Sequence, residues 1–513
     1  MTGHNLVQTL RTRLPVLSLT TISGEHLAPF LIVFFSGANL TLVQWVMVRE
    51  VTTLLLGTEL VVLLTSVSYF VGVSIGYLLA GHIQRQWLPV MGIATLLLHL
   101  TLPVTLRVLV AWLGSNGAYW AAFLVLPLIT PFAVSMFYSV FLPHFIDSKG
   151  ISLGSLYVTE LMGTICGVGV LVFLAGLGLQ TVYTIYSLGL IIVLISLGIQ
   201  RWLAAILSIA SAAWIIALPI MNTWSNEVWY TRLLGFPQGT EVIYSEYSPY
   251  QKVDVLELPD GNRALYLDGL EHFNGAIGIR LNIIVGAVPT TLIEPQNSLI
   301  IGGGAMQTEQ LIASRGGHVT TVELDPVVAD VGARLFYNYN QMDILPNRTV
   351  VVDDAKHFLA NIDAQYDLII ADTPAALSIQ PATLYSVPFY QLIHDHLTPG
   401  GIFVGNMTSG FVPGDIISRR VAASLLEVFD EVIIVTPASV GWSFVFAADD
   451  LPFTREELEA ALRKCGEVQF STFDLNATRL IVGDAPPITL DSMDLVLQTS
   501  LEWIESRLHW GER

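Results

Sequence analysis

The chain has 513 residues, of which 53% are hydrophobic and 13% charged, and its mean hydropathy is +0.62. This composition excludes an ordinary soluble protein, and the net charge of −19 argues against nucleic acid as a partner, because a phosphate backbone needs a positive surface. The two cysteines, Cys166 and Cys465, lie far apart, so neither a disulfide framework nor a metal site is expected.

The charge is unevenly distributed along the chain. The first 224 residues hold seven basic and five acidic side chains, so the negative net charge belongs to the remainder. An acidic surface keeps a protein soluble and also suits a cationic substrate. The chain is therefore predicted to join an apolar region to an acidic, water-soluble one.

Residues 1–222 are predicted to form a multi-pass α-helical membrane bundle. About 20 apolar residues are enough to cross the hydrocarbon core of a bilayer. About seven stretches of that length occur, at residues 27–48, 59–81, 87–108, 118–142, 153–175, 179–199 and 202–221. We therefore expect a protein of the cell (inner) membrane with the lipid bilayer as a partner.

The charges near these spans do not settle their orientation. An N-terminus on the inside leaves Arg49 and Arg107 outside and puts five basic residues in the cytoplasm, namely Arg11, Arg13, Arg85, Lys149 and Arg201. Seven spans would then place the C-terminal region outside. A cofactor made in the cytosol favours the opposite arrangement, and we expect the C-terminal region on the cytoplasmic side. Arg49 and Glu50 are interpreted as snorkelling at a helix end, and Glu160 is the candidate for an interior role.

The pattern changes near residue 222. The stretches EVIYSEYSPYQKVDVLEL (241–258) and NRALYLDG (262–269) alternate and are separated by the turn sequence PDGN, so residues 223–297 are predicted to be a small antiparallel β region. Strands and helices alternate over residues 298–450, which predicts a doubly wound α/β domain with a parallel sheet. Residues 451–513 are expected to be a C-terminal α/β extension with an amphipathic helix and a peripheral strand.

The end of the first predicted α/β strand carries a glycine turn. Gly302, Gly303 and Gly304 let the backbone approach a ligand without a side-chain clash. Glu323 ends the second strand, where a carboxylate can accept both hydroxyls of a ribose. Ligands bind at the carboxyl ends of the strands in such sheets, so we expect a nucleoside here.

The next two strand ends continue this pattern. Asp354 and the small Ala355 follow the third strand and suit an adenine, whose amino group donates to the carboxylate. Asp372 ends the fourth strand, over the expected reacting centre. Four such strand ends favour a class I S-adenosyl-nucleoside-binding fold over a nicotinamide-binding one, because GGGAMQ lacks the third glycine of the dinucleotide fingerprint.

These motifs, in this order, resemble the spermidine synthase (polyamine aminopropyltransferase) family in its membrane-fused form. The motifs are SPYQKVDVLE, LYLDG, IIGGG, VELDP, DDAKHFL, YDLIIAD and LYSVPFY. The resemblance implies that Gln251 contacts the nucleoside, with Glu323 on its ribose and Asp354 and Ala355 on its adenine. It also implies that Asp372 is the catalytic proton acceptor, that the co-substrate is decarboxylated S-adenosylmethionine, and that no cofactor is permanently bound.

The sequence departs from the family where the amine substrate would bind. Ala305 stands where the family usually has an aspartate after the glycine turn, and Ala375 replaces the second acid of an Asp-x-x-Asp motif. His272 replaces a glutamine, and residues 281–283 replace a Tyr-His-Glu or Tyr-Gln-Glu run. The nucleoside half of the site is thus intact, whereas the amine half has lost several acids.

Three functions remain open from the sequence. The first is transfer of an aminopropyl group to an amine such as putrescine, with other acids, Glu271 for example, in place of those lost. The second is an S-adenosylmethionine-dependent transferase such as a methyltransferase, since Ala305 would tolerate the donor carboxylate. The third is a non-catalytic membrane protein that senses a nucleoside or polyamine. A homo-oligomer is compatible with each.

Overall fold

The computed structural model describes residues 24–55, 57–145, 151–275, 279–342, 347–438 and 441–508. The chain divides into two compact units. The helical unit comprises Met1–Trp45, Tyr69–Thr101 and Phe132–Ile216. The sheet unit comprises Val46–Ser68, Leu102–Pro131 and Ala217–Arg513. The sheet unit therefore includes the ends of several long helices as well as the whole C-terminal region.

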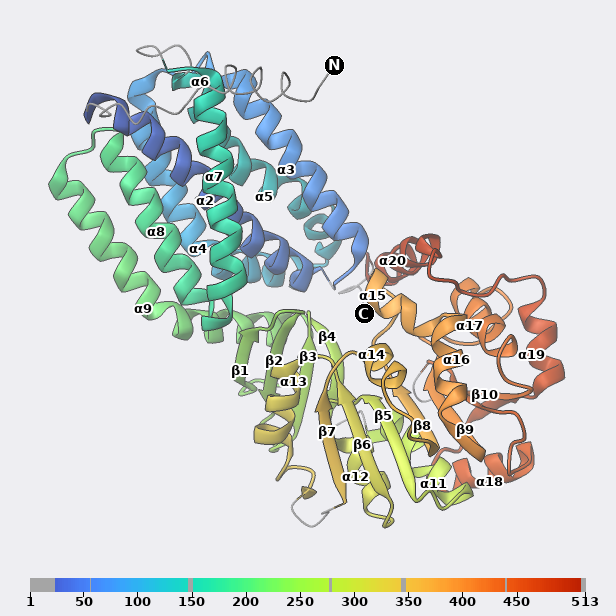
Figure 1. Cartoon of the computed structure of the whole chain (residues 1–513). Coiled ribbons are helices and arrows are strands. Elements are labelled where there is room, and N and C mark those ends of the chain that lie inside the picture. The colour runs from blue at the N-terminus through green and yellow to red at the C-terminus, as the bar shows by residue number, and fades with distance from the viewer. Residues whose placement is uncertain are drawn as a thin grey trace, which may run out of the picture. The chain divides into compact units, whose positions relative to one another are not determined.

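Long apolar helices make up the N-terminal part of the chain (Figure 1). They are α2 (Gly24–Leu54), α3 (Glu59–Ala80), α4 (Leu88–Ser115), α5 (Tyr119–Ser139), the short α6 (Phe141–Phe145), α7 (Leu153–Leu174), α8 (Leu179–Ser196) and α9 (Arg201–Arg232). Among the described residues, seven helical segments are long and apolar enough to cross a membrane, which confirms the predicted number of helices. Of the basic residues used for the orientation, Arg11, Arg13 and Lys149 lie outside the described residues.

A four-stranded antiparallel sheet follows α9. Its strands are β1 (Glu241–Tyr247), β2 (Lys252–Glu257), β3 (Arg263–Leu267) and β4 (Leu270–Asn274), in the order β1-β2-β3-β4. The predicted hairpin strands are confirmed. Asp268 and Gly269 form the turn between β3 and β4 with φ values of 47° and 76°, the left-handed conformation that a two-residue hairpin loop requires.

The second sheet has eight strands in the order β12-β10-β11-β9-β8-β5-β6-β7. They are β5 (Asn297–Gly302), β6 (His318–Glu323), β7 (Arg348–Val352), β8 (Tyr366–Asp372), β9 (Leu397–Asn406), β10 (Glu431–Pro437), β11 (Phe444–Ala448) and β12 (Phe470–Phe473). The neighbouring strands β7, β6, β5, β8 and β9 are parallel, as predicted. The strands β11, β10 and β12 pair antiparallel. The expectation of a parallel sheet is therefore wrong for that end, where the short β10–β11 connection leaves no room for a crossover helix.

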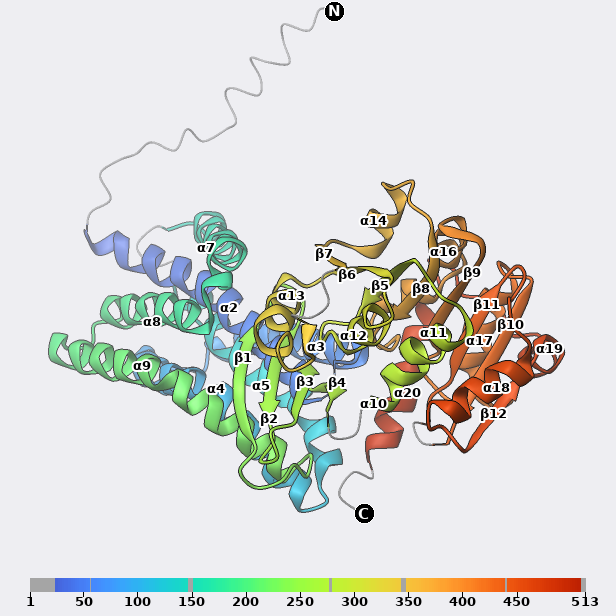
Figure 2. The ribbon, with the colours of Figure 1, turned by 90° about the horizontal axis from the view of Figure 1, so that it is seen from below.

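Helices cover both faces of this sheet. They are α10 (Ile279–Asn282), α11 (Pro289–Leu292), α12 (Gln307–Ala313), α13 (Pro326–Val331), α14 (Ala355–Ala360), α15 (Ile379–Ala382), α16 (Val387–Asp395), α17 (Ile416–Leu426), α18 (Arg455–Lys464), α19 (Leu475–Val482) and α20 (Met493–Leu508). Figure 2 shows α14 and α16 on one side of the strands and α11 and α18 on the other. Alternate residues of β5 serve the two cores, with Leu299 and Ile301 in one and Ile300 in the other.

Within the sheet unit, buried charges join the helix ends to the four-stranded sheet. Glu50 of α2 is 0% exposed and accepts hydrogen bonds from Arg107 of α4, at 2.5 and 3.1 Å, and from the hydroxyl of Tyr247 in β1. In β2, the Lys252 ammonium lies 2.9 Å from the Asp254 carboxylate, and both are buried. We call these five residues the buried charge network. The interpretation of Glu50 as a snorkelling residue is wrong, because its partner Arg107 comes from another helix.

Candidate active site

The glycine turn lies where the strand order of the eight-stranded sheet reverses, between β5 and β8. Gly302 and Gly303 have φ values of +88° and +83°, a conformation that residues with a Cβ rarely adopt. Gly302 pairs with Asp372 of β8, and a Cβ on Gly302 would overlap the Asp372 backbone carbonyl. A Cβ on Gly303 would lie 4.0 Å from Oδ2 of Asp372. The turn therefore brings the backbone directly against the predicted catalytic residue.

Glu323 ends β6, beside this turn. One of its oxygens accepts a hydrogen bond from the Asp325 backbone N–H at 3.0 Å, and the other would lie 3.5 Å from a Cβ on Gly304. Burial and, to a smaller extent, the negative charges of Asp325 and Asp372 raise the pKa of Glu323 to about 7, although the hydrogen bond from the Asp325 backbone N–H opposes the shift. The carboxylate is thus held at the predicted nucleoside edge, in surroundings that disfavour its charge.

Asp354 and Ala355 lie beyond the end of the edge strand β7. The Asp354 side chain accepts a hydrogen bond from the Lys356 backbone N–H at 2.8 Å and so caps α14. Ala355 is buried in the core beneath that helix. The structure gives both residues a local structural role, and their contact with an adenine stays a prediction.

Gln251 lies in the turn between β1 and β2 and reaches across to the eight-stranded sheet. Its side-chain N–H donates to Asp325 Oδ2 at 3.2 Å, and the Ser248 hydroxyl donates to the same oxygen at 2.6 Å. Arg49, at the end of α2, donates to the backbone carbonyls of Ser248 and Pro249 at 2.6 and 2.8 Å. A residue of a long apolar helix therefore fixes the turn that carries Gln251. Sequence reasoning missed this role, because the two segments are about 200 residues apart.

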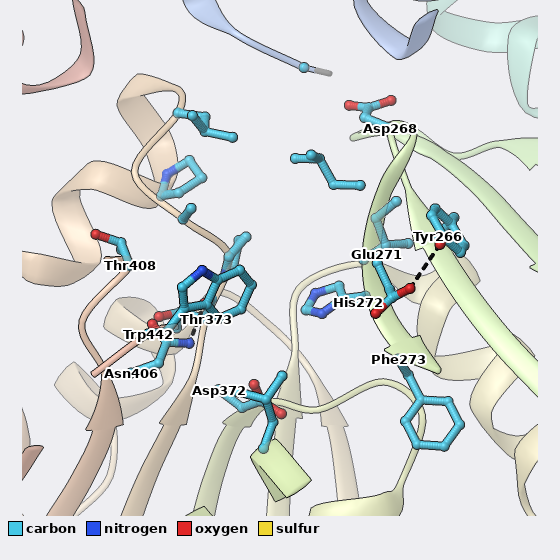
Figure 3. Close-up of a pocket in the computed structure, with 18 of the residues that line it drawn as sticks. Tyr266, Asp268, Glu271, His272, Phe273, Asp372, Thr373, Asn406, Thr408 and Trp442 are labelled. Carbon is cyan, nitrogen blue, oxygen red and sulfur yellow. Dashed lines mark hydrogen bonds between the residues drawn. The ribbon is translucent and has the colours of Figure 1, made fainter. Parts of the chain in front are cut away.

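A cavity of about 460 Å³ opens in front of Asp372 (Figure 3). Its walls come from β4, from the loop after β8, and from Asn406, Thr408 and Trp442. Within the described residues, no side chain donates a hydrogen bond to the Asp372 carboxylate. Burial raises the pKa of Asp372, and the nearby His272 partly opposes that shift. The group is a carboxylate with raised basicity facing an open cavity.

The cavity unites only part of the predicted site. Gln251 and Asp372 both line it, whereas the three glycines, Glu323, Asp354 and Ala355 do not. Glu323 and the glycines lie near Asp372, which lines the cavity. The motif LYSVPFY serves the cavity indirectly, since the Tyr385 hydroxyl contacts the Pro374 carbonyl at 3.0 Å and Asn406 at 2.9 Å. It thereby holds the loop after β8.

The two alanines that stand for lost acids have different surroundings. Ala375 lines the cavity. Ala305 does not, because it is 7% exposed and packs in an apolar cluster with Val328, Val331 and Phe336. An aspartate at position 305 would therefore enter a hydrophobic core, and the idea that Ala305 tunes the choice of donor is not supported by its surroundings.

Several residues that line the cavity carry no signal in the sequence. Trp442 lies in a loop and Trp503 on α20, and neither position belongs to a recognisable motif. Gly57, between α2 and α3, also lines the cavity. Thr408 and Gly57 each have a φ of +65°, a local feature that is visible in the structure alone.

Comparisons with known proteins find sequence relatives for the C-terminal part of this chain. Residues 281–451 match the sequence model of the spermine/spermidine synthase domain. A polyamine aminopropyltransferase from Oceanobacillus iheyensis is 28% identical over 264 residues, which cover 47% of this chain and 51% of that protein. One from Sulfurisphaera tokodaii is 28% identical over 237 residues, which cover 44% of this chain and 78% of that protein.

A solved structure is also similar. It is a probable spermidine synthase from Corynebacterium glutamicum, 20% identical in sequence with a TM-score of 0.41, and the match covers 48% of this chain and 96% of that one. The chain spans about half or less of the length of several curated relatives that it matches, with coverage of 51%, 41% and 40% in three of them.

Proposed function

We propose that this chain, whose residues 281–451 match the sequence model of the spermine/spermidine synthase domain, is an aminopropyltransferase. It transfers the aminopropyl group of decarboxylated S-adenosylmethionine to a small-molecule amine such as putrescine, giving spermidine and 5′-methylthioadenosine. The observation that carries the proposal is the Asp372 carboxylate, which faces a cavity beside the glycine turn and has a raised pKa. A base in that place suits an amine nucleophile.

The proposed reaction is a direct displacement. The neutral nitrogen of the acceptor attacks the aminopropyl carbon that is bonded to the sulfonium sulfur. The new C–N bond forms as the C–S bond breaks, and the electron pair of that bond neutralises the sulfur. Asp372 accepts the proton that the amine must lose, and the cavity holds the amine in line with the breaking bond. Burial supports this role, because it makes the carboxylate a stronger base.

The donor nucleoside is proposed to bind along the strand ends. Glu323 would accept the ribose hydroxyls, and Gln251 would contact the nucleoside from the β1–β2 turn. Asp354 and Ala355 would meet the adenine, and Gly302, Gly303 and Gly304 would let the sulfonium approach Asp372. The donor is a co-substrate that leaves as 5′-methylthioadenosine, so no permanently bound cofactor is proposed.

The long apolar helices are proposed to hold the enzyme in the cell (inner) membrane. Their length and composition support a multi-pass arrangement. The sheet unit is proposed to face the cytoplasm, because the donor is made there. The four-part division at residues 222, 297 and 450 stays a prediction.

The test is a product assay on the full chain in detergent or nanodiscs. With decarboxylated S-adenosylmethionine and putrescine, we expect spermidine and 5′-methylthioadenosine in equal amounts by mass spectrometry. S-adenosylhomocysteine formed from S-adenosylmethionine would favour the methyltransferase alternative. Nucleoside binding without turnover of either donor would favour the sensing alternative.

A further inference from the structure

A diamine acceptor needs a second anchor in this cavity. One nitrogen must reach the donor near Asp372 as a free amine, and the other remains a charged ammonium. A buried ammonium without a partner is costly. Ala375, which lines the cavity where the resembling family has an acid, offers none. A diamine would bind only if another acid of the cavity supplied the partner.

Among the residues that the structure describes, two acids besides Asp372 line the cavity, namely Asp268 and Glu271. Asp268 belongs to the β3–β4 turn, and its Oδ1 accepts hydrogen bonds from the Lys252 backbone N–H at 2.8 Å and from Thr53 at 3.4 Å. Figure 3 shows it at the end of the cavity opposite Asp372. These contacts explain Asp268 as a structural residue of the turn, because its carboxylate holds β2 and α2 to that turn.

Glu271 lies on β4 and is held in place from one side. Its Oε2 accepts hydrogen bonds from the Tyr266 hydroxyl at 2.9 Å and from the Asn274 side chain at 3.0 Å. Tyr266 is itself fixed, since it is 5% exposed and packs edge-on against Tyr230 with ring centroids 5.0 Å apart. Within the part of the chain that the structure describes, Oε1 of Glu271 has no hydrogen-bond partner.

The Glu271 carboxylate lies on the same cavity as Asp372. Figure 3 shows the Glu271 carboxylate beside His272, on the wall of the cavity that faces Asp372. His272 lies between the two acids in that view. A carboxylate oriented by two fixed donors, with one oxygen left open, is a preorganised anchor for a cation.

We propose that Glu271 binds the distal ammonium group of a diamine acceptor whose reacting nitrogen lies at Asp372. The methylene chain between the two nitrogens passes over His272. This inference rests on the proposed function, because it places the acceptor of that reaction. Glu271, from the four-stranded sheet, would thus take the place of the acid that is missing at position 375.

The test compares two acceptors of equal length at saturating decarboxylated S-adenosylmethionine. 1,4-Diaminobutane carries the distal ammonium and 1-aminobutane does not. Glu271→Gln should lower kcat/KM for the diamine by about 10- to 150-fold, mainly through KM, the effect of one charge-assisted hydrogen bond. It should leave kcat/KM for the monoamine and the affinity for 5′-methylthioadenosine unchanged.

Glu246→Gln is the matched control. Glu246 is also a strand glutamate that accepts a tyrosine hydroxyl, that of Tyr244 at 3.1 Å, but it does not line the cavity. Its replacement should leave kcat/KM for both acceptors unchanged. If 1-aminobutane reacts too slowly, its inhibition constant against 1,4-diaminobutane supplies the same comparison.

The outcomes separate the inference from the function on which it rests. An unchanged ratio of diamine to monoamine in Glu271→Gln would overturn the inference while leaving the transferase activity in place. An equal loss for both amines would show that Glu271 only supports β3 and β4, which also overturns it. Absence of 5′-methylthioadenosine formation in the wild type, with either amine, would instead refute the proposed function.

Discussion

The two sheets bring different kinds of groups to the same cavity. The eight-stranded sheet contributes residues at the ends of neighbouring strands, above an apolar core. The four-stranded sheet contributes one wall through β4, and polar residues buried against helix ends support it from behind. The first arrangement follows from local strand patterns, whereas the second depends on contacts between distant segments. The chemistry is thus proposed to reside on one sheet and the choice of acceptor on the other.

The strongest test of this comparison removes the proposed base. Asp372→Asn should lower the rate of amine transfer by about 10²- to 10⁴-fold, the usual contribution of a positioned general base. Its affinity for 5′-methylthioadenosine should change little, because Glu323 and Gln251 remain. Product formation and nucleoside binding are measured on the same preparation. Asp363→Asn, an exposed acid just before β8, is the control and should retain full activity.

The next test breaks the buried charge network. Glu50→Ala leaves the Arg107 guanidinium buried without its carboxylate, which should destabilise the sheet unit by about 3–5 kcal/mol. Thermal unfolding in detergent measures this loss. Asp330→Ala removes an exposed ion pair with Arg334 and should cost about 0.5 kcal/mol or less. Equal effects of the two variants would show that burial adds nothing to the Glu50–Arg107 pair.

A third test asks whether α2 supports the nucleoside half of the site. Arg49→Ala removes the donors that hold the Ser248–Pro249 turn, so affinity for 5′-methylthioadenosine should fall about 10- to 100-fold. Arg49→Lys should recover only part of it, because an ammonium lacks the two-pronged donor of a guanidinium. Calorimetry gives the affinities, with the exposed Arg232→Ala as control. An unaltered affinity in Arg49→Ala would confine the nucleoside site to the eight-stranded sheet.

The smallest expected effect is a pH dependence of nucleoside binding. Glu323 has a pKa raised to about 7, and ribose hydroxyls donate best to its ionised form. Affinity for 5′-methylthioadenosine should therefore rise with pH, by about tenfold between pH 6 and pH 8, as the free carboxyl loses its proton. Glu323→Gln should bind more weakly and without that slope. A slope that persists in this variant would assign the titration to another group.

The sequence predicted the eight-stranded sheet better than the contacts of the four-stranded sheet. The strands β5 to β8 and their terminal residues could be predicted, because short apolar runs rich in β-branched residues and a glycine turn are local signals. The antiparallel strands β10 and β11 were missed, because short apolar strands do not reveal their direction of pairing. Glu271 could be named only as an example, since its orientation depends on Tyr266 and the packing behind it.

The partners of Glu50 could not be predicted for a related reason. Nothing near residue 50 indicates that Arg107, 57 residues away, would face it in the folded chain. A charge next to an apolar run is equally consistent with a buried ion pair and with a helix end in contact with water. The presence of the helices was thus predictable from composition, but the contribution of their ends to the sheet unit was not.

The buried charge network also has a consequence for the evolution of such chains. Lys252 and Asp254 lie on a face of β2 that the end of α9 covers, and Tyr230 and Asn226 of that helix bind them at 2.8 Å. A descendant that lost its N-terminal helices would leave these polar groups without those partners. In a chain that keeps the helices, replacing Lys252 or Asp254 alone would leave the other charge buried without its ion-pair partner. The residues at positions 226, 230, 252 and 254 should therefore be inherited as a set in lineages that keep the helices.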